Sequence, residues 1–197
     1  MENFFCSSYA CHYGQYLLNR AYVMLPFGEL DRRKEFLFDV FGRDRRIFIR
    51  PDSPLKLFTG QVASREKFAS DLEYMAWYEF PPSSIVLVSS PREILAEWRF
   101  VVSRGRIVTG CQYKLDGKLD YRPEYDHAAL ELAQAIANVD YEPDPAWVMD
   151  ICKTSDNAYH LLEIGGFSFA DLYVCDKSKV VAAVSAAAAE AWQNVPR

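Results

Sequence analysis

Asp150 and Glu163 are the first residues in this chain whose types and spacing could do chemistry. They lie in the stretch Trp147–Phe169, which is rich in aliphatic, aromatic and β-branched residues on both sides of a polar centre. That centre holds Asp156-Asn157, a pair that suits a two-residue hairpin turn because both residue types tolerate positive φ. The stretch therefore predicts an antiparallel hairpin with one carboxylate on each strand.

The predicted turn also sets the register of this hairpin, with Ser155 opposite Ala158 and Asp150 opposite Glu163. Directly opposed Cβ atoms lie about 4.5–5.5 Å apart, where like charges destabilise a sheet unless a cation lies between them. Mg²⁺ is held by one or two carboxylates together with substrate phosphates, so we expect the pair to bind magnesium. The alternative is a register that differs by one residue, with one carboxylate in solvent.

Arg50 and Lys56 are candidates for contact with phosphate groups. Arg50 ends a short apolar strand predicted from Arg46, and Lys56 lies in the loop 51–60 that follows. A guanidinium, an ammonium group and the backbone N–H groups of such a loop can bind a phosphate chain. The alternative is an ordinary surface loop, because turn residues and a basic side chain often follow a strand.

Glu97 and Arg99 form a third candidate group. They are two residues apart in a strand predicted for Ala96–Ser103, so their side chains share one face of the sheet. This spacing fits either a surface ion pair or a pair of functional groups.

The composition is that of an ordinary globular protein, with 197 residues, 50% hydrophobic residues and a net charge of −5. This is enough to bury a sizeable core in one compact domain or two small lobes. The negative charge argues against general binding of nucleic acid or anionic membranes, although the basic run Arg43–Arg46 leaves an RNA-directed enzyme open. No apolar run reaches the roughly 20 residues needed to cross a bilayer, and no secretory signal opens the chain, so we expect a cytoplasmic protein.

The five cysteines are irregularly spaced and do not suggest a disulfide framework. Three of them lie in or beside predicted strands and are expected to be small core residues: Cys111, Cys152 and Cys175. A soft-metal site at Cys6, Cys11 and His12 would lack a fourth ligand.

The elements that must position these residues alternate between strands and helices. Besides the strands named above, apolar runs predict strands at 84–89 and 106–113, the second following a turn at Arg104-Gly105. Helices are predicted for 29–41, from Ser64 to about Tyr78, for a short segment after the capping box Ser90–Glu93, from Asp126 onward, and for 178–193. The expected buried faces are Leu30, Leu37, Val40 and Phe41 in the first helix and Val181, Val184, Ala188 and Trp192 in the last. Residues 1–28 stay unassigned, and 114–125 are expected to be a polar connection.

Five short motifs in order along the chain resemble the ATP-grasp superfamily. They are Ile49-Arg-Pro51, Lys56-x-Phe-Thr-Gly60, Glu97-Trp-Arg99, Asp150 and Leu162-Glu-Ile164. The pattern is most similar to the small bacterial and phage clade that has arginine in place of a phosphate-binding lysine. The resemblance implies an α+β fold of two small lobes with antiparallel sheets that clasp a nucleotide, at 29–88 and 89–197.

The resemblance also implies an ATP-dependent ligase of the carboxylate-amine type, which works through an acyl-phosphate formed from Mg-ATP. The acceptor would be a small molecule or a peptide that offers a carboxylate and an amine. The implied phosphate-binding and catalytic residues are Arg50, Lys56 and Arg99. The implied adenine and ribose contacts are Leu87, Val88 and Glu97, and the implied magnesium ligands are Asp150 and Glu163.

Two departures from the family pattern affect this expectation. The superfamily usually has Glu-x-Asn where this chain has Glu163-Ile-Gly165, so one side-chain oxygen for a second metal ion is missing. Typical members also carry an N-terminal α/β domain, whereas here only residues 1–28 precede the first predicted helix. A homodimer or a partner subunit could then complete the acceptor site. The alternative function is a nucleotide-binding interaction module with decayed catalysis.

Overall fold

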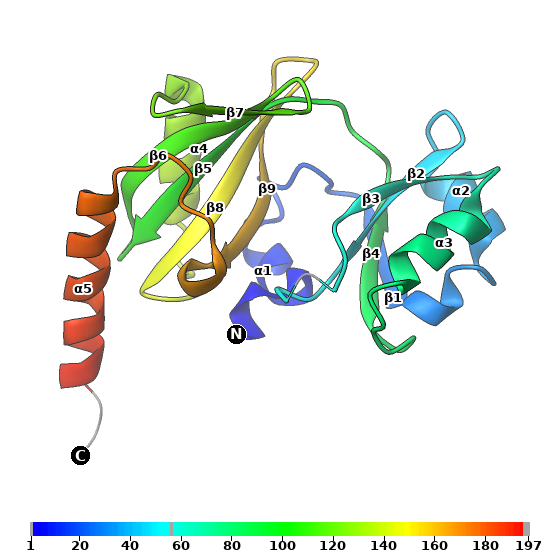
Figure 1. Ribbon diagram of the computed structural model, residues 1–197, viewed down its shortest axis with the longest axis horizontal. Coiled ribbons are helices and arrows are strands. Elements are labelled where there is room, and N and C mark those ends of the chain that lie inside the picture. Colours follow the sequence, from blue (N-terminus) through cyan, green and yellow to red (C-terminus); the bar gives the residue numbers. More distant parts are fainter. Residues whose placement is uncertain (1, 56, 195–197) are drawn as a thin grey trace. The chain divides into compact units, whose positions relative to one another are not determined.

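The computed structural model describes residues 2–55 and 57–194 and divides the chain into two compact units, each with its own antiparallel sheet (Figure 1). The four-stranded unit comprises Phe5–Ser7 and Asn19–Arg92. The five-stranded unit comprises the residues up to Phe4, Ser8–Leu18 and the chain from Glu93 onward. The first 28 residues thus contribute to both units, through η1 (Glu2–Phe4), α1 (Cys6–Tyr13) and β1 (Tyr22–Pro26). The α+β prediction is confirmed.

The four-stranded sheet has the order β1-β4-β2-β3. Its other strands are β2 (Arg46–Pro51), β3 (Gln61–Ser64) and β4 (Ile85–Ser89). The helices α2 (Lys34–Phe41) and α3 (Phe68–Ala76) cover one face of this sheet (Figure 1). Aliphatic and aromatic residues from both helices and three strands form its buried core: Leu37, Phe38, Phe41, Phe68, Met75, Ile47, Ile49, Ala63, Val86 and Val88.

The predicted helices of this unit are shorter than expected. The helix predicted for 29–41 begins at Lys34, after the 3-10 turn η2 (Phe27–Glu29), and Phe38 rather than the exposed Val40 completes its buried face. The helix predicted from Ser64 begins at Phe68, because Gln61–Ser64 is a strand paired with β2. Tertiary pairing has here overridden local helix signals.

The five-stranded sheet has the order β7-β6-β5-β8-β9. Its strands are β5 (Ile94–Ser103), β6 (Arg106–Leu115), β7 (Lys118–Arg122), β8 (Ala146–Thr154) and β9 (Tyr159–Gly166). Along the edge strand β9, Leu17 lies parallel to Leu161, and Leu161 exchanges backbone hydrogen bonds with Tyr16 and Leu18. The segment 16–18 therefore covers backbone groups that an edge strand would otherwise expose.

Two tight turns connect β5, β6 and β7. Arg104-Gly105 and Asp116-Gly117 all have positive φ, as two-residue hairpin turns of type I′ require. The first turn was predicted. The strand β7 was missed, and 114–125 is not simply a polar connection, although Asp-Gly is a hairpin signal that could have revealed it.

The short helix predicted after the capping box Ser90–Glu93 is wrong. The strand β5 begins directly at Ile94, and it is buried between β6 and β8. A capping box predicts a helix only when a helical pattern follows it, and the residues after Glu93 are those of a fully buried strand.

The helices of the five-stranded unit lie where the sequence predicted them. Asp126 caps α4 (His127–Ala137) by accepting a hydrogen bond from the Ala128 N–H, and α5 (Lys177–Gln193) follows the 3-10 turn η3 (Phe167–Phe169). The buried face of α5 is not the predicted one, however. Val180 and Ala187 pack inward, whereas Val181 and Trp192 are largely exposed.

None of the helices in the described part of the chain is long and apolar enough to span a membrane.

Candidate functional site

Arg99, Asp150 and Glu163 form a row across three neighbouring strands of the five-stranded sheet. Arg99 on β5 is directly opposite Asp150 on β8, and Asp150 is directly opposite Glu163 on β9. Cross-strand partners share a face, so the three side chains project from the same side of the sheet. The predicted pairing of Asp150 with Glu163 is confirmed.

The route to this pairing differs from the predicted one. Thr154 rather than Ser155 pairs with Ala158, so the loop has three residues, and Asn157 at its end has positive φ. This turn sets a register one residue away from the predicted one, with Ile151 opposite Leu161. A bulge at Leu162 then adds one residue to β9 and brings Glu163 opposite Asp150.

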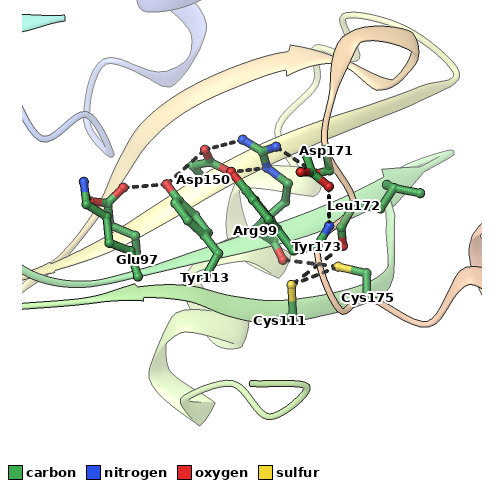
Figure 2. A network of polar contacts seen from close by, with 10 residues as sticks. Glu97, Arg99, Cys111, Tyr113, Asp150, Asp171, Leu172, Tyr173 and Cys175 are labelled. Carbon is green, nitrogen blue, oxygen red and sulfur yellow. Dashed lines mark hydrogen bonds and ion pairs between the residues drawn. The ribbon is translucent and has the colours of Figure 1, made fainter. Parts of the chain in front are cut away.

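Arg99 and Asp150 form a buried bidentate ion pair, drawn at the centre of Figure 2. The Arg99 Nε donates to Asp150 Oδ1 at 2.8 Å, and Nη2 donates to Oδ2 at 2.7 Å. Arg99 is 6% exposed and Asp150 is 2% exposed. Burial disfavours the charged guanidinium, yet the hydrogen bonds and the charge of Asp150 hold the pKa of Arg99 above its ordinary value.

Tyr113 on β6 connects this ion pair to Glu97 (Figure 2). Its hydroxyl lies 2.5 Å from Glu97 Oε2 and 3.2 Å from Asp150 Oδ2, so it can donate its proton to either carboxylate. Burial raises the pKa of Tyr113, and the two neighbouring carboxylates raise it further, so the hydroxyl stays protonated as a donor. Glu97 is also paired with Lys114, 2.8 Å from its Oε1.

The segment 171–175, which precedes α5, lies over Arg99. The Arg99 Nη1 donates to the Asp171 carbonyl at 2.9 Å. The Tyr173 ring stacks on Tyr113 at 4.7 Å between centroids, and the Arg99 guanidinium lies 4.9 Å from the Tyr173 centroid. The sequence predictions missed both tyrosines, because neither belongs to a motif and Tyr173 reaches Arg99 only through the path of its segment.

The fold family implies a magnesium ion at Asp150 and Glu163, and the described side chains can be tested against it. Asp150 does not fit as a ligand in this arrangement, because both of its oxygens already accept hydrogen bonds from Arg99 and one also lies within reach of Tyr113. Glu163 fits better, since Mg²⁺ can be held by one carboxylate plus phosphates. Within residues 2–55 and 57–194, no cluster of three histidine, cysteine or acidic residues could hold a metal ion, so the predicted site at Cys6, Cys11 and His12 is not formed.

The remaining predicted residues lie in the four-stranded unit. Arg50 is half-buried on β2, opposite Leu87. Leu87 and Val88 lie on the inner strand β4, whose backbone pairs with β1 and β2, and this pairing argues against adenine contacts from their backbone groups. Lys56 lies outside the described residues.

The basic run in this unit is engaged in surface ion pairs. Arg45 lies 3.0 Å from Glu66, and Arg46 lies 3.7 Å from Asp44. Acidic partners at this surface give no support to the RNA-directed alternative.

A family model described as an ATP-grasp domain, the second family of its clade, matches residues 29–183. No curated protein sequence matches the chain.

Solved structures give a consistent picture of the fold. D-cycloserine synthetase DcsG is 16% identical, with a TM-score of 0.61 over 90% of this chain and 66% of its own. ATP-grasp ligase PsnB, solved with minimal precursor, Mg and ADP, is 11% identical, with a TM-score of 0.55 over 94% of this chain and 59% of its own. Cdc123 from Schizosaccharomyces pombe is 14% identical, with a TM-score of 0.57 over 92% and 90%. At these identities the similarity shows the fold, and this chain spans less than two thirds of the length of the first two proteins.

Proposed function

The chain belongs to the ATP-grasp family, and from this membership we propose that it is an ATP-dependent ligase of the carboxylate-amine type. The observation that supports the proposal beyond the family match is the row Arg99, Asp150 and Glu163 on one face of the five-stranded sheet. A cation and two carboxylates in register are suited to a nucleotide that carries phosphates and magnesium.

The proposed reaction has two steps. A carboxylate oxygen of the acceptor attacks the terminal phosphorus of ATP, the bond to the bridging oxygen breaks, and ADP leaves. An amine then attacks the carbonyl carbon of the acyl-phosphate, so that an amide forms, inorganic phosphate leaves and the amine loses a proton to solvent. Such phosphoryl transfer depends mainly on positioning and charge neutralisation.

The residues assigned to this reaction are those that the sequence singled out. Arg50 and Lys56 would hold the ATP phosphates from the four-stranded unit. Arg99 would contact them from the five-stranded unit, and Glu97 would lie near the ribose. Asp150 holds the Arg99 guanidinium by two hydrogen bonds, so we assign to it first the role of positioning that cation.

Magnesium enters this proposal with the nucleotide, as Mg-ATP. Glu163 would bind the ion together with phosphate oxygens, and the ion would neutralise phosphate charge. Asp150 could bind it directly only if Arg99 released one of the Asp150 oxygens.

The experiment that tests the proposal is an assay of ADP release. The protein is incubated with Mg-ATP and a panel of amino acids, peptides and amines, alone and in pairs. We expect ADP release above the background without acceptor for at least one pair, with one amide formed for each ADP. Binding of Mg-ATP without ADP release in any combination would contradict the ligase proposal.

Gly165 favours a second candidate, a nucleotide-binding interaction module with decayed catalysis. It lies two residues after Glu163 on β9, on the same face, and has no side-chain oxygen for a metal ion. The module predicts tight binding of Mg-ATP and no turnover, so the same assay separates the two candidates.

A further inference from the structure

Cys111 and Cys175 bring two sulfur atoms into contact beneath the charged row (Figure 2). Cys111 lies on β6 directly opposite Arg99, and Cys175 lies just before α5. Their Sγ atoms are 3.3 Å apart, and both residues are buried, at 0% and 4% exposure. A disulfide bond has a sulfur–sulfur length of about 2.0 Å, so only a small shift separates this contact from a bond.

The two thiols are not equivalent. The Cys175 S–H donates to the Cys111 sulfur, and this hydrogen bond lowers the pKa of Cys111 and raises that of Cys175. The Arg99 cation also lowers the Cys111 pKa. Because the thiolate is the reactive form, Cys111 is suited to react first and Cys175 to resolve the product.

A bond between these sulfurs would act on the segment 171–175. That segment already contacts the sheet through the Asp171 carbonyl, which accepts from Arg99, and through the Tyr173 ring, which stacks on Tyr113. The next residue, Asp176, donates its N–H to Thr109 on β6. All these contacts are non-covalent and can open together, whereas a disulfide at Cys175 would prevent the segment from leaving Arg99.

We propose that Cys111 and Cys175 form a reversible disulfide on exposure to hydrogen peroxide, and that the bond holds the segment 171–175 closed over Arg99. In the first step the Cys111 sulfur attacks a peroxide oxygen, the oxygen–oxygen bond breaks, and a sulfenic acid and hydroxide form. In the second step the Cys175 sulfur attacks the Cys111 sulfur and water leaves with the Cys175 proton. Two thiols and one peroxide thus give one disulfide and two waters.

The bond itself is tested by mass spectrometry of the folded full chain treated with peroxide. We expect a mass about 2 Da lower, a mapped link between the peptides that contain Cys111 and Cys175, and recovery of both thiols with dithiothreitol. Cys111→Ser and Cys175→Ser should each abolish the link, whereas Cys11→Ser, at an exposed cysteine, should leave it intact. A link between other cysteines, or oxidation of Cys11 alone at every peroxide concentration, would overturn the proposal.

The closure is tested by hydrogen exchange of the amides of 171–175. Oxidation should slow their exchange in the parent protein and in Cys11→Ser, and peroxide should have no such effect on Cys111→Ser. Equal exchange in the oxidised and reduced parent would show that the bond does not hold the segment.

A consequence for nucleotide binding rests on the proposed function, because it assumes that phosphates contact Arg99. Oxidised protein should then bind Mg-ATP several-fold more weakly than reduced protein, with the difference removed in Cys111→Ser. If the reduced parent binds no Mg-ATP, the proposed function fails while the disulfide and exchange results still decide the redox proposal.

Discussion

Asp150 and Glu163 face each other across β8 and β9 because a bulge at Leu162 shifts the register of the hairpin by one residue. The turn alone would set Asp150 opposite Leu162 and place Glu163 on the other face of the sheet. The bulge is therefore what brings the second carboxylate to the face that carries Arg99. Bulges are known to re-aim side chains beside active sites, and this one does so for the row of charged groups.

The ion pair of Arg99 and Asp150 should be required for folding stability. Asp150→Ala leaves a buried cation without its partner and should lower the free energy of unfolding by about 3–5 kcal/mol. Replacing both residues, as in Arg99→Met with Asp150→Leu, should cost less, because no unpaired charge stays buried. Urea denaturation measures both values, and a double variant less stable than Asp150→Ala would contradict this account of the pair.

Arg50 should matter for nucleotide binding. Arg50→Ala should weaken Mg-ATP binding by about 2–3 kcal/mol, the cost of losing a charge-assisted contact at a half-buried site. Lys56→Ala should cost less, since a loop lysine loses more side-chain entropy for each contact that it makes. Arg46→Ala is the matched control, because Arg46 is an exposed arginine on the same strand. Calorimetric titrations that show equal affinity for all three variants and the parent would place the phosphate site elsewhere.

Gly165 can be substituted without strain. Its backbone is outside the left-handed region, and an added Cβ would lie 3.5 Å from the Val148 Cγ2, an ordinary contact. Gly165→Asn should therefore fold like the parent and place an amide oxygen on the face of Glu163. If the parent binds Mg-ATP without turnover, this variant is expected to gain ADP release, and Gly165→Ala, which adds no oxygen, is expected to gain none. Equal rates in both variants would rule out a missing metal ligand as the cause.

The N-terminus of α4 should make stability depend on acid pH. The Tyr159 hydroxyl donates to Asp126, and this hydrogen bond lowers the pKa of Asp126. A lowered folded-state pKa gives stability that is present above the unfolded value near about 3.9 and is lost as the pH falls through the folded value. Tyr159→Phe should therefore reduce the free energy of unfolding more at pH 7 than at about pH 3. An equal reduction at both pH values would show that the loss comes from packing alone.

The sequence predicted most of what depends on strand periodicity and on short local signals. The strand cores of β2, β4, β5, β6 and the β8–β9 hairpin were predicted in this way, as was the cap at Asp126. The signals failed where pairing with a distant strand decides the structure, as at Gln61–Ser64 and after Ser90–Glu93. Long-range pairing is invisible to a local pattern.

The candidate site divides in the same way. Glu97 and Arg99 share a face because they are two residues apart in one strand, and this relation could be predicted. The links from Tyr113 to Asp150 and from Arg99 to Asp171 join residues 37 and 72 positions apart, so no local spacing reports them. The bulge at Leu162 also has no local signal, since Leu is an ordinary strand residue.

The most direct test of the proposed ligase is ADP release by the parent and by Glu163→Gln, measured with Mg-ATP and the best acceptor pair. Glutamine keeps the size of the side chain but removes the negative charge that would hold magnesium on the phosphates, so the rate should fall about tenfold or more. Both proteins should show the same thermal unfolding, which confirms that the loss is not one of folding. Turnover by the parent that persists unchanged in Glu163→Gln would contradict the role of the charged row in the reaction.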